Sequence, residues 1–535
     1  MRLKHPNMRP AGAPVRLRFD GAEIEALTGE TIAAALAAAD IVSVRQARSG
    51  APRGPFCGMG ACFDCLVTVD GRPNQRACLT KVTDGMDVLS EPIAGPPTGA
   101  SAAAAEEIAC DVLVVGAGPA GLSAARDLAR AGANVIVADE RLHAGGQFFK
   151  PLAPSQLAER QHLDRQFRDG AALHEAALQA GVHILNETTV WAAFSATDVA
   201  AIVAGRSTLF RPRRLVLATG AYEQSLPVPG WTLPGVMTVG ALQTLARSYR
   251  VAPGERIVIA GNGPLCLQTA AELLDGGANV VAVLESASRP TVGNLPEFLR
   301  AGWAAPTLLV SGLALVSRLK PLLHWRRRVT RLLGDDRVRR VEAADLSIDA
   351  DIVALGYGFS SSSELARSLG CRHHFVLRGS GSMETVTDAD GRTSVPEVFA
   401  IGDGARFGGA QAAMAAGASE PGACPALPEG LVATVRGGTT AGRRHRFRRR
   451  RVPLRGGECR RDARRGEGRS QHAGRAQARH AGRHGTLSGP LLRAVDRPHL
   501  LGRAGRIRSV CAPTAGQAGA DPRAHDRAAR VDRPR

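Results

Sequence analysis

The sequence predicts an α/β protein with four parts. These are a small β-rich N-terminal domain, a nucleotide-binding domain of alternating strands and helices, a second domain of that type inserted into the first, and an arginine-rich tail. Three observations carry this prediction. Four cysteines lie in one short segment near the N-terminus, two glycine-rich loops each follow an apolar strand and precede a helix, and hydrophobic periodicity stops near residue 418.

The net charge of +19 belongs entirely to the tail. Residues 421–535 contain 27 Arg, no Lys and 8 acidic residues, a balance of 27 − 8 = +19, so the other 420 residues carry no net charge. A strongly basic composition ordinarily indicates a nucleic-acid or anionic-membrane partner. Because the body of the chain is neutral and long enough for two or three domains, we expect no specific nucleic-acid partner.

Composition also bears on the compartment. The sequence has no run of about 18 apolar residues, as a transmembrane helix would need, and its first residues lead into no apolar signal core. We therefore expect a cytoplasmic protein without a transmembrane segment, which could reach the inner membrane only through partners. In a reducing compartment, four closely spaced cysteines indicate metal or cluster ligation rather than disulfides.

The first domain is predicted to span residues 1–92. Residues 15–19 and 23–26 alternate apolar and polar side chains around Asp20-Gly21, a pair favoured in hairpin turns. An alanine-rich helix is expected to follow Thr31 and to end near Ala39. The cysteines come after this helix.

These cysteines follow the pattern C-x4-C-x2-C-x12-C and are Cys57, Cys62, Cys65 and Cys78. The first three spacings are those of a plant-type [2Fe–2S] loop, in which a glycine-rich backbone offers N–H groups to the sulfurs. Gly58 and Gly60 lie where that wrapping is needed. The alternative is a zinc knuckle, but zinc sites usually contain two C-x2-C pairs. The spacing favours a cluster that moves single electrons.

Residues 93–107 are rich in Pro, Gly and Ala and are predicted to be a linker. An apolar strand at 111–115, a helix at 122–131 and a second strand at 134–138 follow, as in a dinucleotide-binding βαβ unit. The loop glycines that would admit the pyrophosphate are Gly116, Gly118 and Gly121. Asp139 ends the second strand, where an acidic residue can accept hydrogen bonds from the adenosine ribose.

The same pattern recurs in residues 251–345. Gly261 and Gly263 follow an apolar strand, and Glu285 ends the next one. The third glycine position is occupied by Cys266, which weakens close helix–strand packing. The sequence therefore leaves two interpretations open: NAD(P) binding, or retention of the fold without binding.

Three later segments resemble two-dinucleotide-domain flavoproteins of the glutathione-reductase type. They are Gly145-Gly146-Gln147, the strand end at Thr219-Gly220, and the late strand that ends at Gly402-Asp403. This resemblance implies that FAD is the first cofactor and that Asp403 binds its ribityl chain. It also implies that the FAD domain has two parts, residues 108–250 and 346–418.

Longer strings narrow the family. Residues 220–223, 227–231, 234–237, 355–359 and 408–411 resemble the FAD subunit of opine oxidases, hydrogen cyanide synthase and hydroxyproline dehydrogenases. This resemblance covers residues 15–418 and implies a β-grasp ferredoxin-like first domain. It also implies a heteromeric amine or amino-acid dehydrogenase, in which a D-amino-acid-oxidase-like flavoprotein subunit oxidises the C–N bond. The present chain would relay electrons through flavin and [2Fe–2S] to an electron acceptor.

No catalytic residue is assigned. Glu223, His143 and Tyr357 are polar residues near flavin motifs and are interpreted as structural. One alternative function is a self-sufficient NAD(P)H-dependent reductase that uses the second glycine loop. No C-x2-C pair lies beside either nucleotide motif, so a thioredoxin-reductase-like mechanism lacks its nucleophiles. The alternative from another class is a nucleic-acid-binding protein that acts through the arginine-rich tail.

Residues 419–535 are predicted to be disordered, because Arg, Gly, Ala and Pro dominate and cannot bury enough apolar area to offset the ordering entropy. A shifted reading frame would also explain this composition. Residues 452–458 and 483–493 can be encoded so that loss of one base yields C-x-C and C-x4-C strings. These resemble a bacterioferritin-associated-ferredoxin module, whereas Cys424, Cys459 and Cys511 have no ligand spacing as translated.

Overall fold

The computed structural model describes residues 1–4, 8–90, 105–158, 163–291, 306–377 and 381–409, the single residues 294, 299, 303 and 414, and the pair 450–451. All of them belong to one compact unit, Met1–Ala494. Most of the predicted linker at 93–107 lies outside the described residues. So does the predicted tail at 419–535, apart from residues 450–451.

The N-terminal domain is built on one five-stranded sheet. In the order β3-β2-β8-β6-β7, it contains β2 (Pro14–Phe19), β3 (Ala22–Leu27), β6 (Leu66–Val69), β7 (Arg72–Arg76) and β8 (Asp87–Leu89). The predicted hairpin is confirmed: β2 and β3 pair antiparallel, and the turn residues Asp20 and Gly21 have φ of 48° and 83°. Two successive positive φ angles define a type I′ turn, whose twist matches that of the paired strands.

Helix α1 (Ile32–Ala38) packs against this sheet. The Thr31 side chain caps it by accepting a hydrogen bond from the Ala34 N–H at 3.3 Å. Most residues of α1 are alanines, and all but the last are buried, so the helix lies close to the strands. Two short strands, β4 (Arg45–Gln46) and β5 (Pro52–Arg53), then lead into the cysteine loop.

The first nucleotide-binding fold has a parallel sheet extended by an antiparallel meander. Along β12-β10-β9-β15-β14-β13, with β28 also paired to β15, it contains β9 (Glu106–Val115), β10 (Val135–Ala138), β12 (His183–Leu185), β13 (Thr188–Ser195), β14 (Asp198–Val203), β15 (Arg206–Leu217) and β28 (Val398–Ala400). Strand β9 begins at Glu106, earlier than predicted, because β15 pairs with its first residues. It therefore starts inside the predicted linker.

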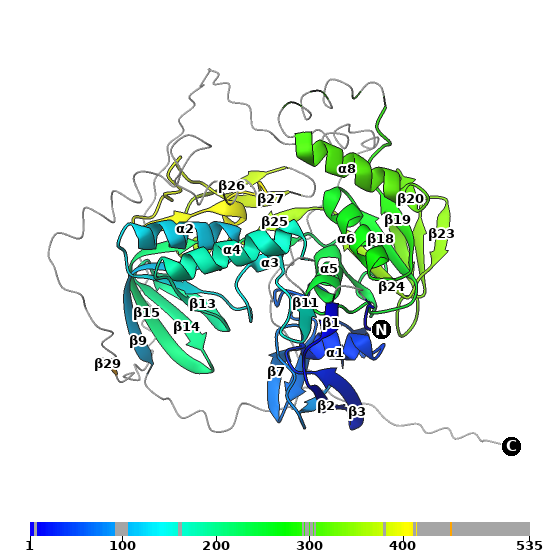
Figure 1. The fold of residues 1–535 in the computed structure, drawn as a ribbon, viewed down its shortest axis with the longest axis horizontal. Helices are drawn as coiled ribbons and strands as arrows, with labels where there is room; N and C mark the ends of the chain where they lie inside the picture. The colour runs from blue at the N-terminus through cyan, green and yellow to red at the C-terminus, as the bar shows by residue number, and fades with distance from the viewer. Residues whose placement is uncertain are drawn as a thin grey trace, which may run out of the picture. The chain divides into compact units, whose positions relative to one another are not determined.

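In the described part of this fold, the helices that follow β9, β10 and β11 (Gln156–Ala158) are α2 (Pro119–Arg130), α3 (Gly146–Phe149) and α4 (Arg165–Gln179). Figure 1 shows α2 and α4 lying side by side over the sheet of β9, β13, β14 and β15. Leu122 and Leu128 of α2 are fully buried against Val112 and Val114 of β9 in one hydrophobic core. A second core, which includes Phe210 of β15, forms from the alternate residues of the same strands.

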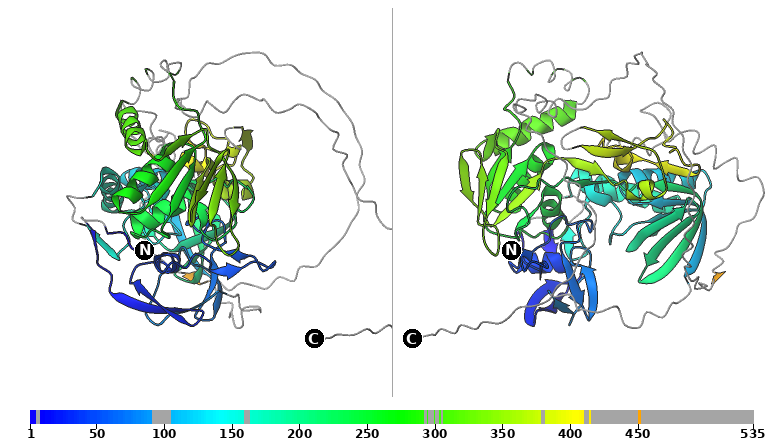
Figure 2. Two further views of the ribbon diagram at one scale, coloured as in Figure 1. Left: turned by 90° about the vertical axis from the view of Figure 1, so that its right-hand side faces the viewer. Right: turned by 180° about the vertical axis from the view of Figure 1, so that it is seen from behind.

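The second fold is a parallel sheet with the order β17-β24-β18-β19-β20. It contains β17 (Val236–Thr238), β18 (Ile257–Gly261), β19 (Val280–Glu285), β20 (Leu323–Trp325) and β24 (Ile352–Gly356), with helices α5 (Val239–Ser248), α6 (Pro264–Asp275) and α8 (Pro306–Leu319). Seen from behind, its strands form a body separate from the fan of the first sheet (Figure 2). The predicted limits of the inserted domain are residues 251 and 345, whereas this sheet includes strands outside them. Strand β17 comes before residue 251 and forms an edge of the sheet, and β24 comes after residue 345 and pairs between β17 and β18.

Several smaller elements complete the described structure. They are the sheet of β21 (Val329–Leu333), β22 (Arg340–Ala343) and β23 (Leu346–Asp349); the pairs β1 (Met8–Pro10) with β11 (Gln156–Ala158), β16 (Ala221–Glu223) with β25 (Phe359–Ser361), and β26 (His373–Val376) with β27 (Ser382–Thr385); helix α9 (Glu364–Ser368); and the 3-10 turn η3 (Gly402–Gly404). The β1–β11 pair joins the N-terminal segment to the first fold. Strand β29 (Arg450–Arg451) pairs with β9, although disorder is predicted for these two residues.

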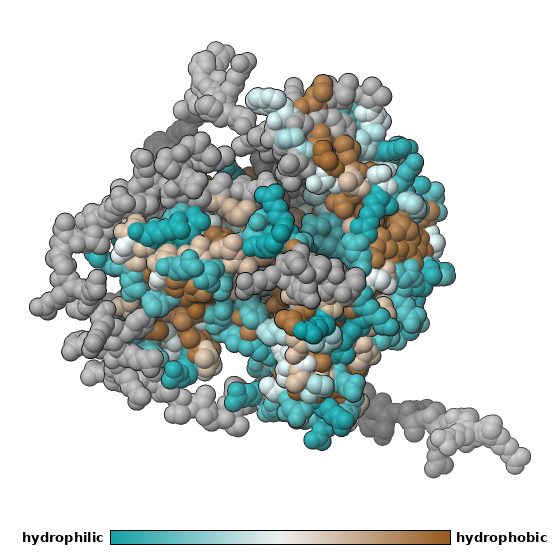
Figure 3. Space-filling view, in the orientation of Figure 1, coloured by the Kyte–Doolittle hydropathy of each residue, from teal (hydrophilic) through white to brown (hydrophobic). Residues whose placement is uncertain are grey.

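The surface of the second fold carries exposed apolar side chains. Hydrophobic surface is visible over α8 (Figure 3), where Val310 and Leu313 are 66% and 51% exposed. Within the described part of the chain, no helix has both the length and the apolar character needed to cross a membrane.

Candidate functional site

The four predicted cluster ligands lie together in the N-terminal domain as two pairs. Cys57 and Cys62 interact with each other, and so do Cys65 and Cys78, because each thiol is the largest cause of the pKa shift of its neighbour. Cys57 and Cys62 belong to the loop after β5, whereas Cys65 precedes β6 and Cys78 follows β7. Because β6 and β7 pair antiparallel, the sheet brings the second pair together across its separation in sequence.

Backbone N–H groups point at these sulfurs. The Cys62 N–H donates to Cys57 Sγ and the Asp64 N–H donates to Cys62 Sγ, each at 3.4 Å. The hydrogen bond from Cys62 lowers the pKa of Cys57 to about 6, and the hydrogen bond from Cys78 lowers the pKa of Cys65. One sulfur of each pair is therefore favoured as the thiolate, the form that ligates metals.

The cysteine loop uses glycine where its backbone turns and where it meets a neighbour. Gly58 and Gly60 have φ of 61° and 83°, in the left-handed region. A Cβ atom at Gly58 would lie 2.8 Å from the Cα of Ala241 in α5. The loop therefore rests directly on the first turn of α5.

The paired arrangement fits a binuclear cluster. A [2Fe–2S] cluster is held by four thiolates shared between two irons, whereas a structural zinc site brings all its ligands to one point. Two thiol pairs with N–H donors fit the four thiolates that such a cluster needs.

The first glycine loop has the geometry that a dinucleotide needs. Gly116 follows β9 with φ 107°, Gly118 precedes the first turn of α2, and Gly121 lies within that turn. A Cβ atom at Gly121 would overlap the Gly116 carbonyl oxygen, so this glycine permits close helix–strand packing. A Cβ atom at Gly118 would meet only Gly146 Cα, at 4.0 Å, so an approach to the helix N-terminus stays open.

This loop borders a cavity of about 620 Å³. That volume lies within the range of about 300–1,000 Å³ typical of cofactor and ligand sites. The predicted residues that line it are Gly116, Gly118, Asp139, Gly146, Gln147, Thr219, Gly220 and Asp403. Gly121, Gly145 and Gly402 do not line it and support the turns around it. The cavity fits a dinucleotide that enters with its phosphates over α2.

Asp403 is fixed by backbone donors. The N–H groups of Gly408 and Gly409 both donate to its Oδ1 at 2.9 Å. Burial raises the pKa of Asp403, and these two hydrogen bonds oppose the shift. Thr219 lies nearby and donates through Oγ1 to the Ser362 carbonyl at 2.6 Å. The carboxylate is therefore held at the cavity wall.

Asp139 and Glu140 lie next to each other at the cavity but have different contacts. Both carboxylate oxygens of Asp139 accept backbone hydrogen bonds, Oδ2 from Ala117 at 2.6 Å and Oδ1 from Arg141 at 2.8 Å. Asp139 therefore braces the glycine loop. Glu140 also lines the cavity and was not predicted. The only feature of the sequence that could have indicated Glu140 is its position directly after Asp139.

A buried lysine and a buried glutamate also lie in the cavity wall: Lys150 was not predicted, and Glu223 was predicted to be structural. Lys150 Nζ donates to Gln147 Oε1, the Gly240 carbonyl and Thr244 Oγ1, at 3.1, 2.9 and 2.8 Å. Glu223 Oε2 accepts from the Gly240 N–H at 2.6 Å, while the buried Oε1 has no hydrogen-bond partner. Burial lowers the pKa of Lys150 to about 7 and raises the pKa of Glu223 to about 7.

The chain matches two known protein families. The family described as pyridine nucleotide-disulphide oxidoreductase matches residues 110–418, more than half of the chain. The chain belongs to this family. A second match, to a 2Fe-2S iron-sulfur cluster binding domain, covers residues 12–92. The two matches contain the glycine loops and the four cysteines, respectively.

Relatives of this oxidoreductase are named as parts of larger enzymes. An opine oxidase subunit of Agrobacterium tumefaciens is 35% identical over 323 residues, which are 57% of this chain and 63% of that protein. Hydrogen cyanide synthase subunit HcnB of Pseudomonas aeruginosa is 33% identical over 331 residues, 57% of this chain and 68% of that protein. The chain thus spans somewhat less than two thirds of the opine oxidase protein.

A solved structure supports the fold. L-proline dehydrogenase from P. horikoshii matches with a TM-score of 0.59 and 20% identity, covering 78% of this chain and 75% of that one. The family matches and the two fitting sites agree: this oxidoreductase is a flavoprotein that uses FAD and a [2Fe–2S] cluster.

The second glycine loop of the oxidoreductase differs from the first. The Glu285 carboxylate accepts from the Gly263 N–H at 3.1 Å and from the Ala287 N–H at 2.9 Å. A Cβ atom at Gly261 would lie 2.8 Å from the Cys266 sulfur, which is buried where Gly121 lies in the first loop. None of the predicted residues Gly261, Gly263 and Glu285 lines the large cavity. NAD(P) binding here stays a prediction.

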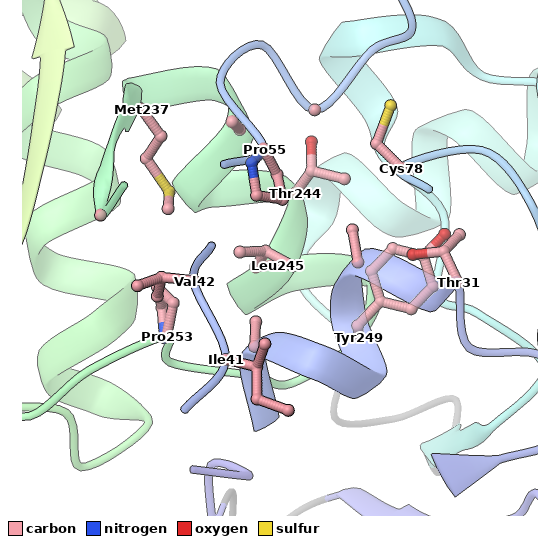
Figure 4. A pocket seen from close by; sticks show the side chains of 15 residues that line it. Thr31, Ile41, Val42, Pro55, Cys78, Met237, Thr244, Leu245, Tyr249 and Pro253 are labelled. Carbon is pink, nitrogen blue, oxygen red and sulfur yellow. The ribbon is translucent and has the colours of Figure 1, made fainter. Parts of the chain in front are cut away.

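A second cavity, of about 30 Å³, separates α1 from α5. In Figure 4, Cys78 and Tyr249 lie on one side of it, and Met237 and Leu245 lie on the other. A space of this size holds a water molecule but no cofactor. It therefore belongs to the packing of the cluster-binding domain against α5.

Two other predicted structural residues can also be placed. The Tyr357 hydroxyl accepts a hydrogen bond from the Val329 N–H at 3.1 Å, as a structural residue would. The His143 Nε2 atom is buried without a hydrogen-bond partner, and burial lowers the pKa of this side chain.

Proposed function

We propose that this chain is the electron-relay subunit of a heteromeric amine or amino-acid dehydrogenase. One observation carries the proposal: Met59, from the cysteine loop, lines the same cavity as the FAD glycine loop. A site for a two-electron carrier and a site for a one-electron carrier therefore adjoin each other. When bound, FAD supplies two-electron chemistry and the cluster supplies one-electron transfer.

The residues of this chain would hold the two groups in adjoining sites. Gly118 and the N-terminus of α2 receive the phosphates, and Asp403 holds the end of the cavity formed by η3. The first turn of α5 lies on Gly58 of the cysteine loop. Lys150 and Glu223 place two titratable groups in the wall, where a proton can be held at the cavity.

We assign the substrate-oxidising step to a partner subunit of the D-amino-acid-oxidase type. The relatives named as subunits of opine oxidase and of hydrogen cyanide synthase support this assignment, since each is one part of a larger enzyme. The substrate class would be an opine or a small amino acid such as glycine or hydroxyproline. A cytoplasmic location suits the free thiols of the cluster ligands.

A second function is a self-sufficient NAD(P)H-dependent reductase. The observation in its favour is that Pro264, Leu265 and Gln268, from the N-terminal half of α6, line the FAD cavity. A nicotinamide nucleotide on the second fold could therefore reach the flavin.

Anaerobic titration separates the two functions. The purified chain is mixed with NADH alone, and then with a D-amino-acid-oxidase-like partner and its amino-acid substrate. Flavin bleaching near 450 nm only in the second mixture, followed by the signal of a reduced cluster, supports the relay. Rapid bleaching by NADH alone would overturn it in favour of the reductase.

A further inference from the structure

Arg76 connects the cysteine loop to the wall of the flavin cavity. Its Nη1 donates to the Gly60 carbonyl at 3.2 Å and to Glu140 Oε2 at 3.0 Å. Its Nη2 donates to Thr189 Oγ1 in β13 at 3.4 Å, and its guanidinium lies 5.8 Å from the centre of the Phe63 ring. One side chain thus contacts two residues of the cysteine loop and two residues of the first nucleotide fold.

The contacts of Arg76 are directional. A guanidinium is planar, always charged and donates in a fixed fork, so its partners are held in a defined relation to each other. Its side chain is only 20% exposed, which limits screening by solvent and salt. A displacement of Glu140 therefore changes the position of the guanidinium relative to Gly60.

Both partners of Arg76 lie next to a cofactor site. Glu140 lines the large cavity, and so does Met59, which is adjacent to Gly60. A hydroxyl group of a ligand in the cavity can donate to the Glu140 carboxylate and compete with Arg76 for its oxygen lone pairs, which weakens the hydrogen bond between Arg76 and Glu140. Gly60 belongs to the loop that carries Cys57 and Cys62.

We propose that Arg76 is a positioning residue that couples occupancy of the flavin cavity to the reduction potential of the [2Fe–2S] cluster. The inference rests on the proposed function only in requiring that both groups bind. The positive charge of Arg76 favours the reduced cluster, which carries one more electron, and the negative charge of Glu140 opposes it. Loss of either Arg76 or Glu140 removes this contact between the cysteine loop and the cavity wall.

The chain offers a matched control. Among the described residues, two ion pairs join the N-terminal domain to the first nucleotide fold: Arg76–Glu140 and Lys81–Glu187, at 3.0 and 3.1 Å. Lys81 and Glu187 do not line the large cavity. Lys81→Gln therefore removes a cation and an interdomain ion pair without breaking the connection to the cavity.

The test is a mediated redox titration of the cluster, followed by electron paramagnetic resonance, on full-length protein with and without FAD. We expect the wild type and Lys81→Gln to show a potential that changes when FAD is removed. Arg76→Gln and Glu140→Gln should show no such change, with Arg76→Gln lower and Glu140→Gln higher than the wild type, and Arg76→Lys should restore part of the FAD dependence.

Several results would overturn the coupling. They are an unchanged wild-type potential on FAD removal, a full FAD dependence in Arg76→Gln, or its loss in Lys81→Gln. If Arg76→Gln fails to assemble its cluster, Glu140→Gln decides alone, because that residue lies outside the cluster-binding domain. The titration needs neither substrate nor any partner. Failure of the dehydrogenase proposal would therefore leave this measurement intact, and the reverse also holds.

Discussion

Two glycines of the first loop have different roles, although they lie three residues apart. Gly121 is needed by the protein itself, because a Cβ atom there overlaps the Gly116 carbonyl, while Gly118 is open on the protein side. We expect Gly118→Ala to change the stability of the FAD-free protein by less than about 0.5 kcal/mol. It should nevertheless weaken FAD binding by roughly tenfold or more, about 1.4 kcal/mol or more.

Gly121→Ala should instead lower the stability of the FAD-free protein clearly. Urea unfolding and fluorescence titration with FAD measure the two effects. If Gly118→Ala kept wild-type affinity for FAD, the phosphates could not approach this glycine.

The cysteines can be tested in the same pairwise manner. Cys65→Ser removes one ligand of the second thiol pair, so iron and acid-labile sulfide should fall to background while FAD absorbance is retained. Cys371→Ser is the control, because Cys371 Sγ hydrogen-bonds to Thr393 Oγ1 at 3.4 Å and a serine hydroxyl can keep that bond. Loss of iron from the control protein as well would contradict the assignment of ligands.

The buried carboxylate of the cavity wall predicts a pH dependence. Burial raises the pKa of Glu223 from 4.5 in the unfolded chain to about 7 in the folded one. Between these values the folded state binds more protons, so its stability falls as pH rises from about 4.5 to about 7. Glu223→Gln lacks this loss and should gain stability over the wild type at pH 8 but little at pH 5.

Urea midpoints at pH 5 and pH 8 measure this difference. An equal effect of Glu223→Gln at both pH values would show that Glu223 titrates normally.

For single residues, the sequence predicts those whose role depends on neighbours within a few positions. The cysteine spacing and the glycine positions encode backbone wrapping and close approach within a few residues. Of the glycines selected in this way, Gly116, Gly118, Gly146 and Gly220 line the cavity. Glu140, Lys150 and Arg76 could not be found this way. Their importance comes from contacts to residues 64 or more positions away, such as Arg76 with Glu140 and Lys150 with Gly240.

Among the elements, α6 carries two acidic residues paired with arginines in different surroundings. Glu272 accepts from Arg247 at 2.6 Å, and the Arg247 side chain is 3% exposed and also binds Asp164 at the start of α4. Asp275 pairs with Arg318 of α8, where both side chains are about half exposed. Breaking a buried pair leaves a charge uncompensated, whereas an exposed pair contributes little.

Glu272→Gln leaves Asp164 as a carboxylate partner of Arg247, so it should destabilise the protein by more than an exposed pair does but by less than about 3 kcal/mol. Asp275→Asn should destabilise it by less than about 1 kcal/mol. Thermal and urea unfolding of the two variants under the same conditions provide the measurement. Equal losses would show that α4, α5 and α6 are not joined through Arg247.

Element types were easier to predict than sheet membership. The βαβ pattern gives α2, α6 and their flanking strands, because hydrophobic periodicity is a local signal. It does not reveal that β17 and β24 join the second sheet, or that β9 begins at Glu106. Both depend on pairing with strands distant in sequence, namely β18 and β15.

For the whole molecule, the described cores and both family matches lie within residues 1–418. We expect a chain shortened after residue 418 to retain the FAD spectrum and two irons per flavin, because the residues that hold both groups are kept. Any salt-sensitive binding to nucleic acid should vanish with the tail. Loss of either chromophore on shortening would contradict this expectation and would direct attention to β29.

The contacts of the cluster-binding domain with both nucleotide folds limit how these folds can move relative to each other. Gly58 lies on Ala241, the Thr238 N–H donates to the Phe56 carbonyl at 2.9 Å, and Arg337 pairs with Asp40, so this domain is attached to the second nucleotide fold. Through Arg76 it is also attached to the first. A hinge rotation between the two folds would have to break one of these attachments. We therefore expect the two cofactor sites to keep the same spacing when the protein is reduced.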